Sequence, residues 1–174
     1  MQRVAVIGAG ITGITTAYSL LRQGVDVTVF DRHRYAAMET SFANGGQLSA
    51  SNAEVWNQWG TIFNGMKWLF DKNAPLSLSM RPSLHKYRWL AEFLANIPNY
   101  EKHTIATVKL AIEARTHLLE MAQSAGIDFD VEKRDILHFY KGQSSFDHAT
   151  KVNALLRKGG LERRAVTAEE MREI

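Results

Sequence analysis

A glycine-rich run near the amino terminus carries the clearest chemical signal in this sequence. It reads Gly8-Ala9-Gly10-Ile11-Thr12-Gly13. With this G-x-G-x-x-G spacing, Gly8 lets a strand turn tightly into a helix, Gly10 lets backbone approach a pyrophosphate, and Gly13 lets the helix pack closely on the strand. The unpaired N–H groups at the start of such a helix also favour phosphate. The whole run is therefore predicted to bind the pyrophosphate of a dinucleotide.

An acidic residue follows at the distance that dinucleotide-binding units use. Asp31 lies about 20 residues beyond the glycines, where a carboxylate accepts hydrogen bonds from ribose hydroxyls. Its charge repels a 2′-phosphate, so NADP is disfavoured although Arg32 and Arg34 follow. NAD and FAD share this fingerprint, and the spacing alone does not separate them.

Local patterns predict one complete βαβ unit to position these residues. Residues 4–7 form an apolar run of strand length that ends at a glycine. Apolar side chains over residues 11–23 recur at helical spacing, and Gly24 is a typical residue just beyond a helix. Alternation over residues 25–30 predicts the second strand, which ends at Asp31. The expected fold class is therefore α/β.

The following part of the chain favours FAD over NAD. A doubly wound NAD domain would offer a third apolar strand after another short helix, whereas residues 36–125 show no clear parallel strand. They give a polar, glycine-bearing loop over residues 36–52 and then mostly helical patterns. In an FAD domain the chain after the second strand runs along the extended cofactor, and such a loop suits that course.

Further elements are predicted along the chain. Helical patterns cover residues 54–70 in part, residues 84–97 before Pro98, residues 104–125, and residues 145–158 with Ser144 or Ser145 as the cap. Alternation over residues 136–140 predicts a strand. Thr167 and Glu170 have the spacing of a capping box, with Thr167 as N-cap and Glu170 three residues later. Because the chain ends soon after this helix start, we expect an N-terminal piece of a longer protein, divided into residues 1–83 and 84–174.

A second motif carries a resemblance to a known family. It reads Met38-Glu39-Thr40-Ser41-Phe42-Ala43-Asn44-Gly45-Gly46-Gln47-Leu48-Ser49. This run resembles the second flavin motif, E-T-S-x-A-N-[AG]-G-Q-[IL]-S, of the D-amino-acid dehydrogenase branch of the FAD-dependent D-amino-acid oxidase family. Residues 66–70 with 74–76, and residues 136–139, also resemble that branch. The resemblance covers essentially the whole chain in order.

The resemblance implies a Rossmann-like, glutathione-reductase-like FAD-binding domain that runs into the start of an α+β substrate domain. In such a domain the three motif glycines hold the pyrophosphate, and Asp31 with Arg32 meets the adenosine ribose. Thr40 and Ser41 would line the phosphate–ribityl region. The residues expected to run past the flavin ring are Asn44, Gly45, Gly46, Gln47 and Leu48.

The implied activity is oxidative deamination of D-amino acids to 2-oxo acids and ammonia, with hydride transfer to FAD and electrons passed to a quinone-type acceptor or another carrier. Sister activities with the same N-terminal half are glycine or sarcosine oxidation, proline dehydrogenation and cyanide-forming glycine dehydrogenation. A non-catalytic FAD- or nucleotide-binding module is the alternative from another class. No catalytic residue is assigned, because the residues that grip the substrate are expected beyond Ile174, in a missing C-terminal half or a partner subunit.

Composition excludes several other classes. The 174 residues carry a net charge of +3, with 45% apolar and 22% charged residues, which are globular proportions without a nucleic-acid-binding stripe. Cysteine is absent, and the six histidines lack ligand-type spacing, so we predict no metal site. Neither a membrane span nor a signal peptide is evident, which predicts a cytoplasmic protein. The aromatic stretch 56–70 with Lys67 and Lys72 offers a peripheral contact with the inner membrane, and the resemblance favours such a contact.

Overall fold

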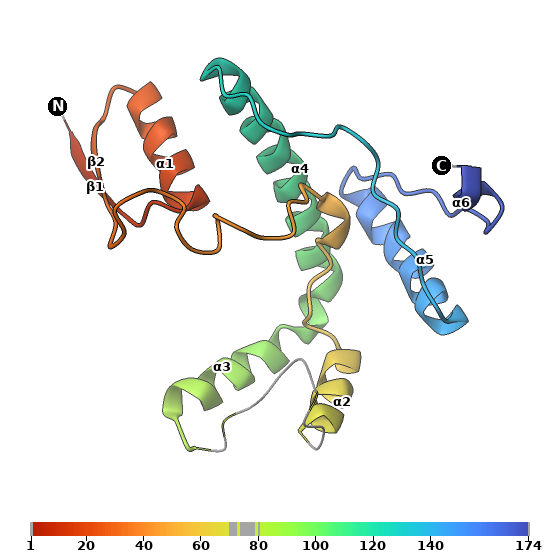
Figure 1. Ribbon diagram of the computed structural model, residues 1–174. Helices are drawn as coiled ribbons and strands as arrows, with labels where there is room; N and C mark the ends of the chain where they lie inside the picture. Colours follow the sequence, from red (N-terminus) through yellow and green to blue (C-terminus); the bar gives the residue numbers. More distant parts are fainter. Residues whose placement is uncertain (1, 70–72, 74–78, 80, 174) are drawn as a thin grey trace. The chain divides into compact units, whose positions relative to one another are not determined.

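The computed structural model describes residues 2–69, 73, 79 and 81–173. The chain divides into two compact units, Met1–Leu48 and Ser49–Ile174, each of which is described by itself. In chain order (Figure 1) the elements are β1 (Arg3–Ile7), α1 (Ile11–Arg22), β2 (Asp26–Phe30), the 3-10 helix η1 (Ala50–Asn52), α2 (Trp59–Trp68), α3 (Leu84–Ala95), the 3-10 helix η2 (Ile97–Asn99), α4 (Tyr100–Ser124), α5 (Gln143–Lys158) and α6 (Glu170–Glu173).

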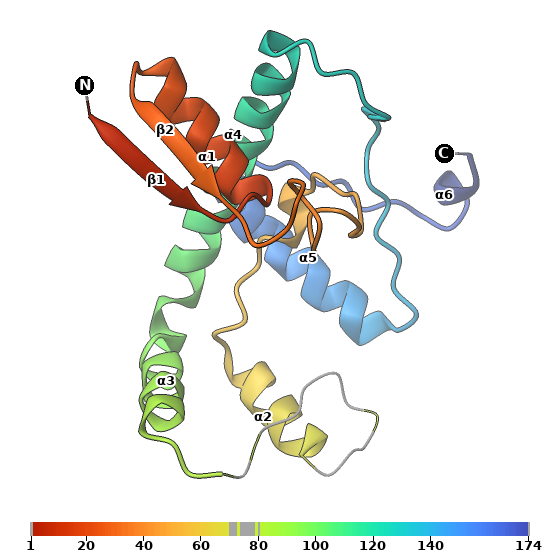
Figure 2. The ribbon, with the colours of Figure 1, turned by 60° about the vertical axis from the view of Figure 1, so that its left-hand side comes forward.

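The first unit is the predicted βαβ unit. β1 and β2 pair in parallel, with Val4 opposite Val27 and Val6 opposite Val29. α1 connects them and lies along the strands (Figure 2). Gly24 follows α1 with φ +79°, a left-handed conformation that glycine adopts without steric cost. The expectation of strand, helix and strand is confirmed, and the element bounds differ from it by about one residue.

The two faces of this small sheet differ in burial. The valines of both strands are half-buried on the side of α1, where Ala17 is fully buried. On the opposite face Ile7 and Phe30 are 82% and 54% exposed. Both are the last residues of their strands, so apolar surface is available at the carboxyl edge of the sheet, where ligands bind in open α/β sheets.

In the second unit α4 and α5 pack against each other around a small apolar core. Its buried members are Ala53, Val108, Val152 and Leu156, of which Val108 and Leu156 have no exposed surface. η1 also contacts α4, so the chain that leaves the first unit lies on the longest helix. The helical periodicity over residues 104–125 correctly placed Val108 on the buried face.

Glu54 joins three segments of the second unit. Its Oε1 accepts a 2.6 Å hydrogen bond from the Tyr100 hydroxyl at the start of α4, and lies 3.1 Å from His148 Nε2 on α5. Burial, followed by the hydrogen bond to Glu54, raises the pKa of Tyr100, so this phenol stays protonated and keeps donating. These contacts hold the segment after η1 against both long helices.

Some predicted elements are wrong in kind or in their bounds. Residues 136–140 form no strand, because a strand needs a hydrogen-bonding neighbour and no described segment pairs with them. The helix predicted over residues 104–125 begins earlier, at Tyr100. Pro98 lies in η2, which runs directly into α4, and proline is tolerated in the first turn of a helix.

The sequence predicted the caps of the last two helices, α5 and α6, and only one of these two predictions is correct. α5 begins at Gln143 with Gly142 as N-cap and no side-chain cap bond, so the prediction of Ser144 or Ser145 is wrong. The capping box is confirmed. The Glu170 carboxylate accepts from Thr167 N at 2.7 Å, and the Thr167 hydroxyl accepts from Glu170 N at 3.2 Å.

α2 and α3 carry apolar faces without a buried residue. Trp59 and Phe63 on α2 are 60% and 58% exposed. Of the predicted aromatic stretch and family-like segments, residue 70, Lys72 and residues 74–76 lie outside the described residues. Within the part of the chain that the structure describes, none of the helices combines the length and the apolar character of a membrane span.

Candidate dinucleotide-binding site

The turn between β1 and α1 has the backbone geometry that a phosphate requires. Gly8 has φ +99°, and its N–H donates to Phe30 O at 2.7 Å, which ties the turn to the end of β2. Gly10 is the N-cap of α1 without a side-chain cap, and the first turn of the helix contains no acidic residue. The amides at Thr12 and Gly13 therefore lack an acceptor within the helix and can donate to an anion.

Two glycines in this turn stand where a Cβ would meet close neighbours. A Cβ at Gly13 would lie 1.9 Å from Gly8 O and 3.4 Å from Val6 Cγ1, so the helix contacts the strand where only hydrogen fits. A Cβ at Gly10 would lie 3.3 Å from Ser41 Oγ. A Cβ at either position would therefore crowd its neighbours, which agrees with the role of glycine in the sequence motif.

Asp31 holds the carboxyl ends of both strands together. One carboxylate oxygen accepts from Ala9 N at 2.7 Å, and the other accepts from His33 N at 2.7 Å. These bonds, with that from Ala9 first, lower the pKa of Asp31 because they stabilise its charged form. An ionised carboxylate offers about four acceptor positions. Two of them remain for further donors.

The loop after β2 turns back over the glycines. Ala37 N donates to Ala9 O at 2.9 Å, and Ala37 has φ +61°, an unusual conformation for a residue with a Cβ. Ile11 N donates to Ser41 Oγ at 3.0 Å. The Ser41 hydroxyl therefore occupies one amide of the helix N-terminus and still has its own proton to donate.

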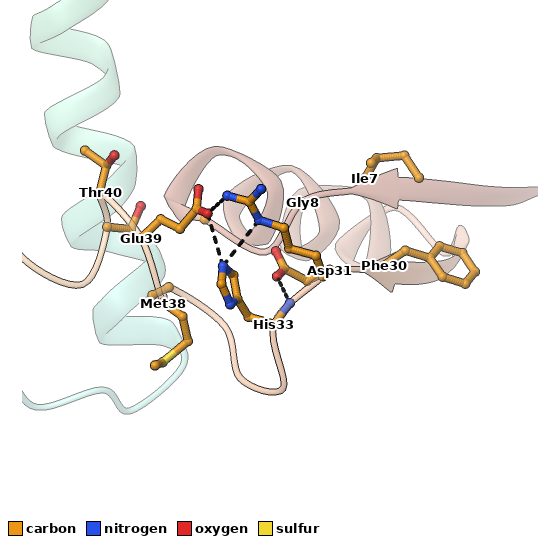
Figure 3. Close-up of a pocket in the computed structure, with 12 residues that line it drawn as sticks. Ile7, Gly8, Phe30, Asp31, His33, Met38, Glu39 and Thr40 are labelled. Atoms are coloured by element: carbon orange, nitrogen blue, oxygen red, sulfur yellow. Dashed lines mark hydrogen bonds and ion pairs between the residues drawn. The ribbon is translucent and has the colours of Figure 1, made fainter.

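A cluster of charged side chains lies beside Asp31. Arg32 forms an ion pair with Glu39, whose Oε1 also lies 3.0 Å from His33 Nε2. Figure 3 shows Glu39 and His33 facing each other across the loop. Arg32 Nε lies 3.3 Å from the same ring nitrogen. All three side chains are largely exposed, so the cluster is a polar wall of the site and not a buried structural pair.

These groups enclose a hollow of about 510 Å³ (Figure 3). A second hollow of about 370 Å³ adjoins the glycine turn. Together they bring predicted cofactor-binding residues from both motifs to one place: Gly8, Gly10, Ile11, Thr12, Gly13, Asp31, Arg32, Thr40 and Ser41. Ala9 lines neither hollow, because it is buried beneath the turn with 6% exposure.

Residues 44–48 line neither hollow. They lie in an exposed irregular segment in which Asn44 Oδ1 accepts from Gly46 N at 2.8 Å and Gly46 has φ +61°. Sequence reasoning also missed lining residues that carried readable signals. Ile7 and Phe30 end the two strands, and Met38 and Glu39 belong to the second motif. The other missed lining residues are Val6, Thr16, His33 and Ala37.

We predict that Asp31→Asn lowers the melting temperature at neutral pH. A carboxamide has one oxygen, so it cannot accept from both Ala9 N and His33 N without turning its own NH₂ toward one of them. Because the folded state lowers the pKa of Asp31, its contribution is complete above the ordinary aspartate pKa of about 3.9 and is lost as pH falls further. The melting curves of both proteins, measured against pH, should therefore converge at acid pH. Asp128→Asn, in an exposed irregular segment, is the matched control; a constant difference at every pH would contradict the prediction.

Comparison with known proteins places this geometry in a family. The protein-family model described as FAD dependent oxidoreductase matches residues 3–174. The chain is 60% identical over 170 residues to D-amino acid dehydrogenase 3 of Mesorhizobium japonicum, which covers 98% of this chain and 41% of that protein. It is 37% identical over 175 residues to D-amino acid dehydrogenase of Dechloromonas aromatica, covering 99% and 42%. No solved structure matches.

The chain thus spans about two fifths of the length of these curated relatives. The family match extends over nearly the whole sequence and includes both the glycine turn and the loop that folds back on it. The α/β unit is accordingly a Rossmann-like cofactor-binding fold, and FAD is the cofactor of this family. The chain belongs to the FAD dependent oxidoreductase (DAO) family.

Proposed function

We propose that this chain forms the N-terminal part of the FAD site in a dehydrogenase that oxidises D-amino acids. The observation that carries the proposal is the 60% identity, over 98% of the chain, to a protein named D-amino acid dehydrogenase 3. A second relative at 37% identity has the same activity in its name. These names support D-amino acids over glycine, sarcosine or proline as substrates, and an enzyme over a non-catalytic module.

The described residues fit the ADP half of FAD. The pyrophosphate would lie at the glycine turn, where the amides of Thr12 and Gly13 donate and the absent side chain of Gly10 leaves room. Asp31 would accept from the adenosine ribose with its two remaining acceptor positions, and Arg32 would lie beside it. Ser41 would donate its hydroxyl proton to a phosphate oxygen, because its oxygen already accepts from Ile11 N.

The segment that follows would serve the flavin half. We place Thr40 near the ribityl chain and Asn44, Gly45, Gly46, Gln47 and Leu48 along the flavin ring. Residues 45 and 46 have no side chain to hinder close backbone approach, and the Asn44 side chain stabilises the turn at Gly46. Backbone N–H groups near the ring would tune its reactivity.

When bound, FAD supplies the acceptor for the hydride that leaves the substrate Cα. The oxidised amino acid is an imino acid, which water hydrolyses to a 2-oxo acid and ammonia. A quinone-type acceptor or another carrier would take up the two electrons. The chain's own residues bind and orient the cofactor, and we assign none of them a catalytic role. Residues 1–83 would belong to the FAD domain and residues 84–174 to the connection and the start of an α+β substrate domain, completed by a C-terminal half or a partner subunit.

We also propose that the aromatic face of α2 contacts the surface of the inner membrane from the cytoplasmic side. Trp59, Phe63 and Met66 follow helical spacing and are 50–60% exposed, and Lys67 adds a positive charge. Co-sedimentation with anionic phospholipid vesicles measures this contact. Loss of binding in a Trp59→Ser variant would support the proposal, and binding equal to that of an uncharged control vesicle would contradict it.

Two steps test the proposed function. First, the purified protein is mixed with FAD and desalted, and we expect a flavin absorption spectrum to stay with the protein. Second, the full-length protein is loaded with FAD and mixed anaerobically with D-alanine, and we expect the flavin band to bleach. L-Alanine, glycine, sarcosine and proline are the comparison substrates. A folded but colourless protein would contradict cofactor binding, and bleaching by glycine, sarcosine or proline but not by D-alanine would contradict the substrate assignment.

A further inference from the structure

The irregular segment between α4 and α5 makes few contacts with the rest of its unit. From Gln123 to Ser145 every residue is exposed except His138, which is half-buried. Its neighbours Leu137 and Phe139 are 45% and 74% exposed. Two residues on, the Tyr140 ring packs edge-on against Phe146 of α5, with ring centroids 6.3 Å apart. His138 itself is held by a polar contact.

That contact is a chain of three side chains. His138 Nε2 lies 2.7 Å from Ser51 Oγ, and Ser51 Oγ lies 2.5 Å from Ser49 Oγ. Ser49 Oγ also accepts from Ser51 N at 3.3 Å and so caps η1. The histidine and the first serine it meets are 87 positions apart in the sequence.

The surroundings of the imidazole determine its charge. Burial, and then the positive charge of Arg163, lower the pKa of His138, so the ring is neutral near pH 7. Arg163 itself donates to the Tyr140 hydroxyl at 3.1 Å. In a neutral ring Nε2 accepts from the Ser51 hydroxyl or donates to its oxygen, depending on the tautomer, and the hydrogen bond between Ser51 and Ser49 can form in both cases.

The serine end of this series of hydrogen bonds, Ser49, is next in sequence to the segment proposed to face the flavin ring. Ser49 directly follows Leu48, and Ala50 is 2% exposed where η1 contacts α4. Residues 42–48 make only local hydrogen bonds among the described residues: Phe42 N to Glu39 O, Asn44 Nδ2 to Thr40 O, and Gly46 N to Asn44 Oδ1. Their carboxyl end continues directly into Ser49, which the hydrogen bonds with Ser51 hold.

We propose that His138 is a positioning residue which, through Ser51 and Ser49, fixes the carboxyl end of residues 44–48 and so the part of the protein that faces the flavin ring. This inference rests on the proposed FAD site. It gives a distant segment of the chain, residues 127–142, a role in the cofactor environment. The competing explanation is that the hydrogen bond between His138 and Ser51 holds only the irregular segment in place and does not affect residues 44–48.

The test compares two substitutions of His138 that differ in hydrogen bonding. His138→Gln keeps an amide near the position of Nε2 that can still bond to Ser51, whereas His138→Leu removes every polar atom. We expect His138→Leu and Ser51→Ala each to weaken FAD binding by roughly five- to tenfold, the effect of one lost hydrogen bond, and to shift the flavin absorption band. His138→Gln should stay within about twofold of the parent protein. His138→Leu combined with Ser51→Ala should be no worse than either alone, because both break the same chain.

The matched control is His117→Leu, on an exposed position of α4. Equal FAD affinity and spectrum in His138→Leu and the parent protein would overturn the proposal, as would equal weakening by leucine and glutamine. If the parent protein holds no FAD, the proposed function fails, and hydrogen exchange of the FAD-free protein decides the positioning role. Faster exchange of residues 44–51 in His138→Leu supports it, and faster exchange confined to residues 127–142 overturns it.

Discussion

Gly13→Ala is expected to remove tight FAD binding and to destabilise the βαβ unit. The added Cβ would lie 1.9 Å from Gly8 O, and a backbone oxygen in a tight turn cannot rotate away as a flexible side chain would. Relief requires α1 to move off β1 or the turn to change shape, and overpacking of this kind costs about 3 kcal/mol or more. If the same distortion disrupts the pyrophosphate site, the affinity falls by at least about 100-fold, since about 1.4 kcal/mol is a factor of ten.

The control for this variant is Gly65→Ala. Gly65 also lies within a helix, α2, but nothing approaches the position of its Cβ within 4 Å. Alanine there should leave FAD binding unchanged and stabilise the helix by up to about 1 kcal/mol. Flavin fluorescence gives the affinity, and urea unfolding followed by circular dichroism gives the stability. Near-parental affinity in Gly13→Ala would show that the helix and strand are not in the contact described above.

Gly159→Ala is expected to destabilise the second unit by about 1 kcal/mol. Its Cβ would lie 2.7 Å from Val108 Cγ1 and 2.8 Å from Val108 Cβ, and Val108 has no exposed surface into which it could move. Overpacking costs about 1–3 kcal/mol. Alanine also lowers the conformational entropy of the unfolded chain, which stabilises the folded state by about 0.4–1 kcal/mol. This gain applies because alanine can adopt the φ of −84° at this C-cap. The cost of the clash therefore exceeds the entropic gain.

A double-mutant cycle separates this clash from a general effect of alanine. Val108→Ala alone leaves a cavity between α4 and α5 and costs about 2 kcal/mol. Combined with Gly159→Ala it removes the nearer atom, Cγ1, and leaves Cβ, so we expect partial relief and a double variant that is more stable than the two single effects predict. Gly142→Ala, with nothing within 4 Å, is the control. Additive effects in urea unfolding would contradict a direct contact between these positions.

The local part of the fold was predictable because its causes are local. Apolar runs of strand length, helical periodicity and glycines that permit φ beyond +20° specify β1, α1 and β2 within a few residues of one another, and these elements agree with the sequence-based expectation. The capping box at Thr167 has the same character, since its two hydrogen bonds join residues three positions apart. The second motif likewise indicated the family, which its match over residues 3–174 establishes.

The prediction of a strand over residues 136–140 is wrong because a strand depends on a partner that can lie far away in the sequence. Alternation of apolar and polar side chains indicates which face of a strand is buried. A strand forms only beside a hydrogen-bonded partner strand, however, and no described segment supplies one. The same segment nevertheless places His138 against Ser51, which no pattern within either segment could indicate.

By itself, the sequence determined the glycine turn, the helix that follows it and the acidic residue at the end of the second strand. Only the tertiary structure decided that Asp31 accepts from Ala9 N, that Ser41 reaches the amide of Ile11, and that Gly159 lies against Val108. The physical reason is the range of the interactions. Backbone preference and periodicity act over a few neighbouring residues, whereas these contacts join segments whose proximity depends on how the helices, strands and loops pack together.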